Sequence, residues 1–310
     1  MARRPRDLSW PPAPEPLEVP VVDDHTHLDT IADALADGVP APTIAEHLAN
    51  AAAVGVDRVV QIGCDLPTAR ETARLVGEHR GGQGRAAMVG GVAVHPNEAP
   101  LHAGVREVAP DGLAPQPREH HAVPLDEAIA EIADLARDND RIRVIGETGL
   151  DRFRTGERGY AAQVASFRAH VALAKELGLP LQIHDRDAHT EVLDVLARDG
   201  APEVTVFHCF SGDAEMAREC VVNGWYLSFA GPITFRANDE LRFALSETPR
   251  SRVLVETDAP FLTPHPYRGR PAAPYLIPVT LRAMAQVRGE AVGELAAAVS
   301  ATAEAIYGPW

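Results

Sequence analysis

Short apolar, β-branched runs alternate with amphipathic helical patterns along most of the chain. Eight runs have strand character: Leu17–Asp23, Arg58–Cys64, Ala86–Val94, Ile142–Gly146, Leu179–Ile183, Val204–Phe207, Trp225–Phe229 and Val253–Glu256. Helical patterns lie between them, at Thr43–Val54, Pro67–His79, Leu125–Arg137, Tyr160–Leu177, Ala188–Ala197, Asp213–Val222 and Asn238–Ser246, and two more follow Pro278. The first of these opens on Thr43-Ile44-Ala45-Glu46, which is typical of a capping box. Strands that alternate with helices predict βαβ units and a parallel sheet.

Eight such units predict an α/β fold of the closed (β/α)8 TIM-barrel type. The alternative is an open doubly wound sheet, but no Gly-x-Gly-x-x-Gly motif follows the first predicted strand. A length of 310 residues suits a barrel with an insertion, since such barrels typically have about 250 residues. No repeat or linker divides the chain, so we expect one domain over residues 18–310.

Two segments depart from the alternating pattern. Residues 1–17 have a basic start and a proline-rich continuation without an apolar signal segment, and we expect a flexible tail. Residues 99–124 are rich in proline and glycine and lack periodicity, which predicts an inserted surface loop. We expect the three histidines of this loop, His102, His120 and His121, to be solvated rather than to bind a ligand.

Composition narrows the classes of function. The chain has 29 basic and 44 acidic residues, a formal net charge of −15, which excludes nonspecific coating of DNA but still allows a phosphodiester substrate at one local site. Cys64, Cys209 and Cys220 are odd in number and far apart, which predicts reduced, mostly buried thiols in a cytoplasmic protein. No apolar run reaches the roughly 18 residues of a membrane span. A monomer is favoured.

The main chemical signal lies where the predicted strands end. The first strand runs into His25-Thr26-His27, and two histidines separated by one residue share a face of an extended chain. Later strands end near further ligand-type residues, Glu147, His184, His208 and Asp258. The carboxyl ends of barrel strands meet at one face, where barrel enzymes build their active sites. We therefore expect these six side chains to be neighbours in space.

Four histidines and two carboxylates exceed the needs of one catalytic ion, which keeps an open position. They suit two divalent ions that share a carboxylate. We assign His25 and His27 to the first ion with Asp258, and His184 and His208 to the second. Glu147 is the expected bridge, because Lys175, the only lysine, lies in a predicted helix and is badly placed for a carbamylated bridge. Imidazole and carboxylate ligands suit Zn, Mn, Ni or Fe and leave Mg possible.

Three further residues are candidate substrate contacts. His95 ends the third predicted strand and either contacts the substrate or hydrogen-bonds to a neighbour. Arg186 follows His184 by two residues, so its guanidinium either holds a phosphate bidentately or forms an ion pair with Asp187 or a neighbouring carboxylate. Arg236 is a second candidate phosphate-holding arginine. Cys209 adjoins His208 but is expected to point away and pack.

The strand-end motifs resemble the TatD family of metal-dependent deoxyribonucleases, within the amidohydrolase-like barrels. The matching segments run in the family's order between about residues 20 and 275: Asp24–Asp29, Val94–Pro96, Ile145–Asp151, Ile183–Ala188, His208–Gly212 and Glu256–Pro260. The resemblance implies a binuclear site made from the six residues above and exonuclease-like hydrolysis of DNA with Mg or a similar ion. Departures are Thr26 for the usual Cys or Ser, Ala93 for a frequent Gly, and Ala272 and Ala273 in place of the late Asn-Glu pair.

We therefore predict a divalent-metal-dependent hydrolase, a DNase in which a hydroxide bridging the ions attacks phosphorus. Glu147 and Asp258 are the expected catalytic residues, and Asp258 also accepts a proton from the nucleophilic water. One alternative is a related barrel hydrolase that acts on an ester, lactone or amide. The acidic net charge favours this alternative mildly. The other is a non-enzymatic metal-dependent binding protein, which the complete ligand set disfavours.

Overall fold

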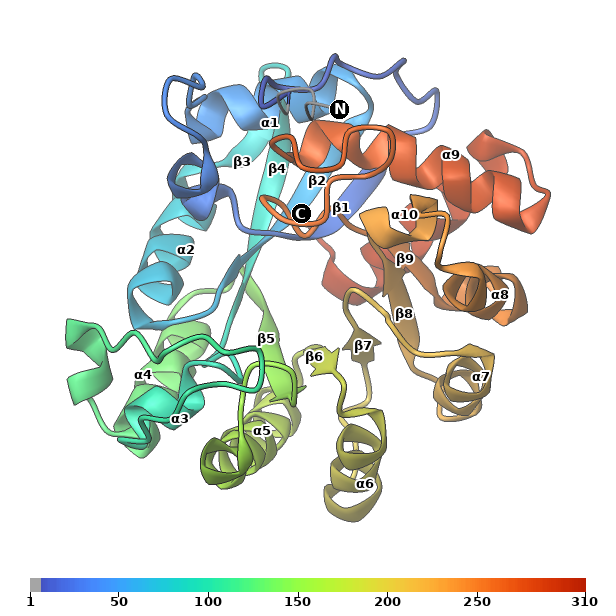
Figure 1. The fold of residues 1–310 in the computed structure, drawn as a ribbon. Coiled ribbons are helices and arrows are strands. Elements are labelled where there is room, and N and C mark those ends of the chain that lie inside the picture. The colour runs from blue at the N-terminus through green and yellow to red at the C-terminus, as the bar shows by residue number, and fades with distance from the viewer. Residues whose placement is uncertain (1–6) are drawn as a thin grey trace, which may run out of the picture.

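Eight parallel strands form a barrel in the computed structural model, which describes residues 7–310 (Figure 1). Their order around the barrel is β1 (Val21–Thr26), β2 (Val56–Gly63), β4 (Arg85–Val92), β5 (Ile142–Asp151), β6 (Leu181–Arg186), β7 (Thr205–Phe207), β8 (Tyr226–Phe229) and β9 (Val253–Val255). The first and last strands meet through the residues that follow them. The backbone N–H of His27 donates to the carbonyl of Ala259 over 2.8 Å, and that of Asp258 donates to His25 over 3.0 Å. The predicted TIM-type barrel is confirmed.

Helices follow most strands and surround the barrel (Figure 1). They are α1 (Ile44–Ala53), α2 (Leu66–Glu78), α3 (Ala99–His102), α4 (Leu125–Asp138), α5 (Glu157–Leu177), α6 (His189–Asp199), α7 (Ala214–Val222), α8 (Asp239–Glu247), α9 (Ile277–Arg288) and α10 (Val292–Tyr307). The predicted capping box is present, because the Thr43 hydroxyl accepts the Glu46 N–H while the Glu46 carboxylate accepts the Thr43 N–H. None of the helices in residues 7–310 is long and apolar enough to cross a bilayer.

The first strand differs from its predicted bounds. It begins at Val21 and continues through two aspartates to Thr26, whereas the apolar pattern places its end at Asp23. Both aspartates are fully buried and hydrogen-bonded: Asp23 accepts the N–H and hydroxyl of Thr257, and Asp24 accepts the hydroxyl of Ser228. Buried polar groups are stable in a strand when they are paired in this way. A ninth strand that the pattern does not predict, β3 (Arg80–Gly82), pairs antiparallel with β4.

The described part of the predicted N-terminal tail lies against the barrel. The indole N–H of Trp10 donates to the Pro40 carbonyl over 2.8 Å, and the Tyr275 hydroxyl donates to the Pro11 carbonyl over 2.8 Å. Leu17 belongs to the hydrophobic core. Residues 7–17 therefore make specific contacts that a flexible tail would lack, whereas the basic start at residues 1–6 lies outside the described residues.

The insertion over residues 99–124 is partly ordered into α3 and a 3-10 turn at Glu119–Ala122. The prediction that its histidines are solvated is wrong. His102 is 5% exposed and His121 is 6% exposed, and the side chain of His120 is 8% exposed. Their burial follows from contacts with carboxylates and carbonyls elsewhere in the chain, which the local sequence pattern does not reveal.

The hydrophobic core between helices and strands sets the stability of the scaffold. Phe167 on α5 is completely buried, whereas Phe243 on α8 is 56% exposed. We expect Phe167→Ala to lower the free energy of unfolding by about 3–5 kcal/mol, because it removes apolar contacts and leaves a cavity. The matched control Phe243→Ala should change it by less than about 0.5 kcal/mol. Denaturant titration of both variants measures the difference, and equal losses would contradict the assigned packing.

Candidate metal centre

The carboxyl ends of β1, β5, β6, β7 and β9 bring ligand-type side chains together at one face of the barrel. All six predicted ligands lie there: His25, His27, Glu147, His184, His208 and Asp258. The two histidines of the His-x-His motif share a face as expected, with 3.2 Å between their Nε2 atoms. Glu147 and His208 are buried, and the side chain of His184 is 18% exposed, so the site opens to solvent at one side.

Glu147 lies between two pairs of histidines. Its Oε1 atom lies 3.7 Å from His25 Nε2 and 3.5 Å from His27 Nε2. Its Oε2 atom lies 3.0 Å from His184 Nδ1 and 2.8 Å from His208 Nε2. Each carboxylate oxygen thus faces one pair, which is the arrangement that a carboxylate shared by two ions requires.

Asp258 completes the group around the first histidine pair. Its Oδ1 atom lies 3.4 Å from His27 Nε2. The backbone of Asp258 has a φ of 53°, in the left-handed region that non-glycine residues rarely adopt. Such backbone conformations cost about 1–3 kcal/mol and are concentrated at functional sites. Here the conformation occurs three residues after the end of β9, where the chain turns and presents the carboxylate to His27.

Outer hydrogen bonds fix the orientation of the histidine rings. The Nδ1–H groups of His25 and His27 donate to Gln182 Oε1 over 2.9 Å and to the Ile62 carbonyl over 3.0 Å. His208 Nδ1 lies 3.3 Å from Glu256 Oε1. These bonds leave each Nε2 atom directed into the site, as in metal-binding histidines whose other nitrogen is held by an oxygen.

His184 has the opposite orientation. Its Nε2 atom lies 3.3 Å from Asp151 Oδ2, and its Nδ1 atom faces Glu147. The amide of Asn97 donates to the same Asp151 oxygen over 3.1 Å and holds it in place. The second histidine pair therefore offers one Nδ1 and one Nε2 atom to the same side of Glu147.

In the absence of metal, the carboxylate of Glu147 is ionised, and the histidines His27 and His184 readily become protonated. Burial raises the pKa of Glu147, but the facing histidines outweigh this effect and hold it well below its usual range. Burial likewise opposes protonation of His27 and His184, yet their hydrogen bonds to Asp258 and Asp151, together with the charge of Glu147, raise both pKa values to about 9. Without metal, protons on these histidines supply the positive charge that a divalent ion would supply.

The donor set fits divalent ions. Adjacent ligand atoms around a zinc-like ion with bonds of about 2.1 Å are separated by about 3.0–3.4 Å, which is close to the separations between these donor atoms. Imidazole nitrogens and carboxylate oxygens are the ligands that Zn, Mn and Ni prefer in common. The residues present therefore suit the metal that the sequence predicts.

The three candidate substrate contacts have different surroundings. His95 Nε2 is 3.6 Å from Glu147 Oε2, and its Nδ1 accepts the Asn97 N–H over 3.0 Å. Because Nδ1 accepts, Nε2 carries the proton of the neutral ring and can only donate. Arg186 is exposed and stacks over Phe153, 3.9 Å from the ring centroid, rather than forming the alternative ion pair with Asp187. Arg236 is exposed on the loop after β8.

Sequence reasoning missed several residues that support the site. The Cys64 thiol donates to Glu147 Oε1 over 3.2 Å, and burial together with Glu147 raises the pKa of that thiol well above its usual value. Gln182 joins His25 to Asp24 and Tyr307, since its amide donates to the Asp24 carbonyl and the Tyr307 hydroxyl over 2.8 and 2.9 Å. The one available signal was a single glutamine in the otherwise apolar predicted strand Leu179–Ile183.

Gln182 gives a direct test of these outer contacts. We expect Gln182→Met to weaken divalent-metal binding by about 10- to 100-fold, because His25 loses the acceptor that fixes its ring. Isothermal titration with Mn²⁺ measures this change. The matched control Gln286→Met alters an exposed side chain on α9 and should leave the affinity unchanged. Equal affinities in both variants would contradict the orienting role.

Comparison with known proteins decides the family. Residues 22–308 match the family model described as TatD related DNase. The chain belongs to this family. It is 39% identical over 292 residues to a protein of Mycobacterium tuberculosis named uncharacterized metal-dependent hydrolase TatD, covering 93% of this chain and 98% of the relative. It is 32% identical over 271 residues to the 3'-5' ssDNA/RNA exonuclease TatD of Klebsiella pneumoniae, covering 85% of this chain and 91% of the relative.

Solved structures agree on the fold. The TatD homologue YJJV of Escherichia coli superposes with a TM-score of 0.73 at 20% identity, over 93% of this chain and 98% of that chain. The TatD family hydrolase of Entamoeba histolytica superposes with a TM-score of 0.76 at 17% identity, over 94% of this chain and 99% of that chain. The chain is a metal-dependent hydrolase of the TatD family. In the segment where the family motif has Asn-Glu, Ala272 and Ala273 are buried in the core.

Proposed function

We propose that this TatD-family protein is a DNase that uses two divalent ions to hydrolyse phosphodiester bonds, exonuclease-like in its action on DNA. His25, His27 and Asp258 hold the first ion, His184 and His208 hold the second, and Glu147 bridges them. The observation that carries the proposal is that each oxygen of Glu147 faces one histidine pair. The name of the Klebsiella relative, a single-strand exonuclease, supports a nucleic-acid substrate.

When bound, two such ions supply an activated water and neutralise charge on the phosphate. The chain's own residues then bind and orient the substrate and move protons. Burial raises the pKa of Asp258, but the hydrogen bond from His27 and the nearby histidines outweigh this and keep it low. Asp258 is therefore ionised at neutral pH and can accept a proton from water. His95 is placed to donate from Nε2 to a phosphate oxygen.

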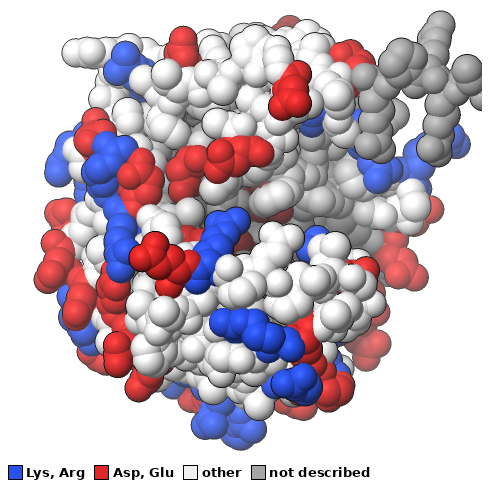
Figure 2. Space-filling model, turned by 60° about the vertical axis from the view of Figure 1, so that its left-hand side comes forward, with Lys and Arg blue, Asp and Glu red and all other residues white. Residues whose placement is uncertain are grey.

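The acidic surface restricts how DNA is held. In Figure 2, acidic and basic side chains are interspersed on the visible face, and the coloured residues there form no broad basic tract. A net charge of −15 makes long-range attraction of DNA unfavourable. The proposed contacts are therefore local, from the ions and from Arg186 and Arg236, both exposed. Such a site suits the end of one strand better than a long duplex tract. A cytoplasmic location and a monomeric state stay predictions.

Digestion of end-labelled single-stranded DNA tests the proposal. Protein freed of metal and reloaded separately with Mg²⁺, Mn²⁺, Zn²⁺ or Ni²⁺ should shorten the DNA stepwise with at least one of these ions. Parallel assays with aryl esters, lactones and amides test the alternative hydrolase. Turnover of such a carbonyl substrate, with intact DNA for every ion, would reject the nuclease and favour the alternative.

A further inference from the structure

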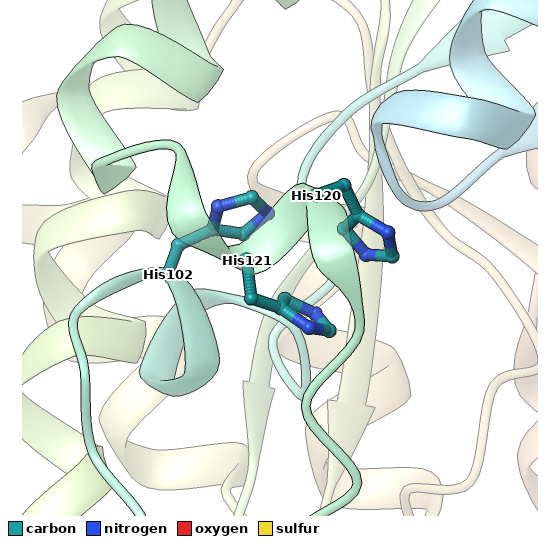
Figure 3. Close-up of side chains that lie close together, drawn as sticks. All are labelled: His102, His120 and His121. Atoms are coloured by element: carbon teal, nitrogen blue, oxygen red, sulfur yellow. The ribbon is translucent and has the colours of Figure 1, made fainter.

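Three histidines of the insertion form a second cluster, outside the six residues of the metal centre (Figure 3). One ring nitrogen from each of His102, His120 and His121 lies within 4.8 Å of the other two. The ring centroids of His120 and His121 are 4.0 Å apart, and those of His102 and His121 are 5.1 Å apart. His102 ends α3, whereas the other two belong to the 3-10 turn at Glu119–Ala122. Two separate elements thus converge on one small volume.

His102 carries a buried lone pair without a donor. Its Nδ1–H donates to the Val123 carbonyl over 2.7 Å, so its Nε2 is an acceptor in the neutral ring. Within the described part of the chain, that Nε2 atom is buried and has no hydrogen-bond partner. Buried polar atoms are nearly always paired, so this imidazole nitrogen within a histidine cluster is a candidate ligand atom.

Two carboxylates face the same cluster. Glu98 Oε2 lies 3.3 Å from His120 Nε2 and 2.6 Å from His121 Nε2. Asp65 uses its Oδ1 atom to cap α2, where it accepts the Thr68 N–H over 2.8 Å. Its Oδ2 atom is left 3.8 Å from His120 Nε2. His120 Nε2 therefore lies within 4 Å of two carboxylate oxygens, beside the other two imidazoles.

His121 has a different role from the other two histidines. Its Nδ1 atom accepts the backbone N–H of Arg118 over 2.7 Å. Its Nε2 atom therefore carries the ring proton and donates it to Glu98, so neither nitrogen of the neutral ring is free for an ion. This bond instead fixes the Glu98 carboxylate beside His120.

We propose that the insertion holds one further divalent ion of the Zn²⁺ class, bound by His102 Nε2, His120 and Glu98 with Asp65 as fourth ligand. Two imidazoles and two carboxylates form a four-ligand set that suits zinc. The ion links α3 and the 3-10 turn to the start of α2. Because it is bound by His102 and His120, it joins the two ends of the segment 103–119; we call this link the clasp and the segment between its ends the closed segment. Asp65 directly follows Cys64, which contacts Glu147, so this clasp secures the insertion beside the metal centre.

Zinc content tests the proposal without using activity. The double variant His102→Gln/His120→Gln removes two proposed ligands, and His79→Gln/His265→Gln is the control with the same number of changed histidines. Each protein is freed of metal, reloaded with Zn²⁺, desalted and analysed by mass spectrometry for zinc per chain. We expect the first variant to hold one equivalent less than the wild type and the control. Equal zinc contents in all three would overturn the site.

Limited proteolysis provides a second readout. Arg106 and Arg118 are exposed trypsin sites in the closed segment. In the wild type, Zn²⁺ should slow cleavage there at least about fivefold, because a bound ion suppresses local opening. If Zn²⁺ slows cleavage in the His102→Gln/His120→Gln variant as much as in the wild type, the proposed site is wrong. If that variant fails to fold, anomalous diffraction from wild-type crystals decides: a zinc peak between His102 and His120 supports the proposal, and its absence rejects it.

Discussion

Replacing Glu147 with glutamine is expected to lower turnover of single-stranded DNA by more than about a hundredfold. This exceeds the loss of about 10- to 100-fold that is typical when a residue hydrogen-bonded to a metal ligand is replaced. An amide has nearly the same size as the carboxylate but no charge and only one oxygen. Its single acceptor can face only one of the two histidine pairs, so the two proposed ions would lose their shared ligand. Initial rates of digestion with saturating Mn²⁺ measure the effect.

The fold should survive this substitution, which separates a catalytic effect from unfolding. Glu176→Gln changes an exposed glutamate on α5 and serves as the control, with unchanged rates expected. His184→Ala removes a proposed ligand from the second pair and should match the loss caused by Glu147→Gln, with circular dichroism spectra close to that of the wild type. Near-wild-type turnover in both Glu147→Gln and His184→Ala would reject the assigned centre.

Removal of metal is expected to abolish turnover and lower the melting temperature by about 5 °C or more. Ions present at about 100 times their dissociation constant stabilise the native state by about 2.7 kcal/mol per site. For a chain of this size, each kcal/mol corresponds to about 2 °C. Activity assays and calorimetry with and without a chelator measure both effects.

The metal-free protein should nevertheless stay folded. The histidines whose pKa values are raised to about 9 are protonated at neutral pH and pair with Glu147, Asp151 and Asp258. The carboxylates of the site are therefore compensated even without an ion. Added Mn²⁺ should restore both activity and melting temperature. Full activity in the presence of a chelator that has removed all bound metal would contradict metal dependence.

The barrel and the proximity of the six proposed ligands were predictable because both depend on local patterns. Alternating strands and helices define the fold, and the end of each strand defines the face where side chains meet. His-x-His on an extended chain fixes two rings on one face whatever the rest of the chain does. The bounds of the strands were less predictable. Asp23 and Asp24 were expected to mark the end of a strand, yet partners on β8, just after β9 and on α10 allow the strand to continue.

Features that depend on distant partners were missed. Gln182 is one polar residue in a strand, and only the fold brings it to His25, 157 positions away in sequence. The histidines of the insertion follow no helical or strand period, and the carboxylate that contacts His121 comes from Glu98, 23 positions earlier. Periodicity carries no information about such pairs, so the sequence predicted solvated side chains where the structure has a buried cluster.

Anomalous diffraction from crystals soaked in Mn²⁺ tests the binuclear centre most directly. We expect two manganese peaks at the carboxyl ends of the barrel strands, about 3.5–4 Å apart, with Glu147 between them. One peak should lie beside His25, His27 and Asp258, and the other beside His184 and His208. A single peak at this face, or two peaks with Glu147 bound to only one of them, would contradict a centre in which two ions share this carboxylate.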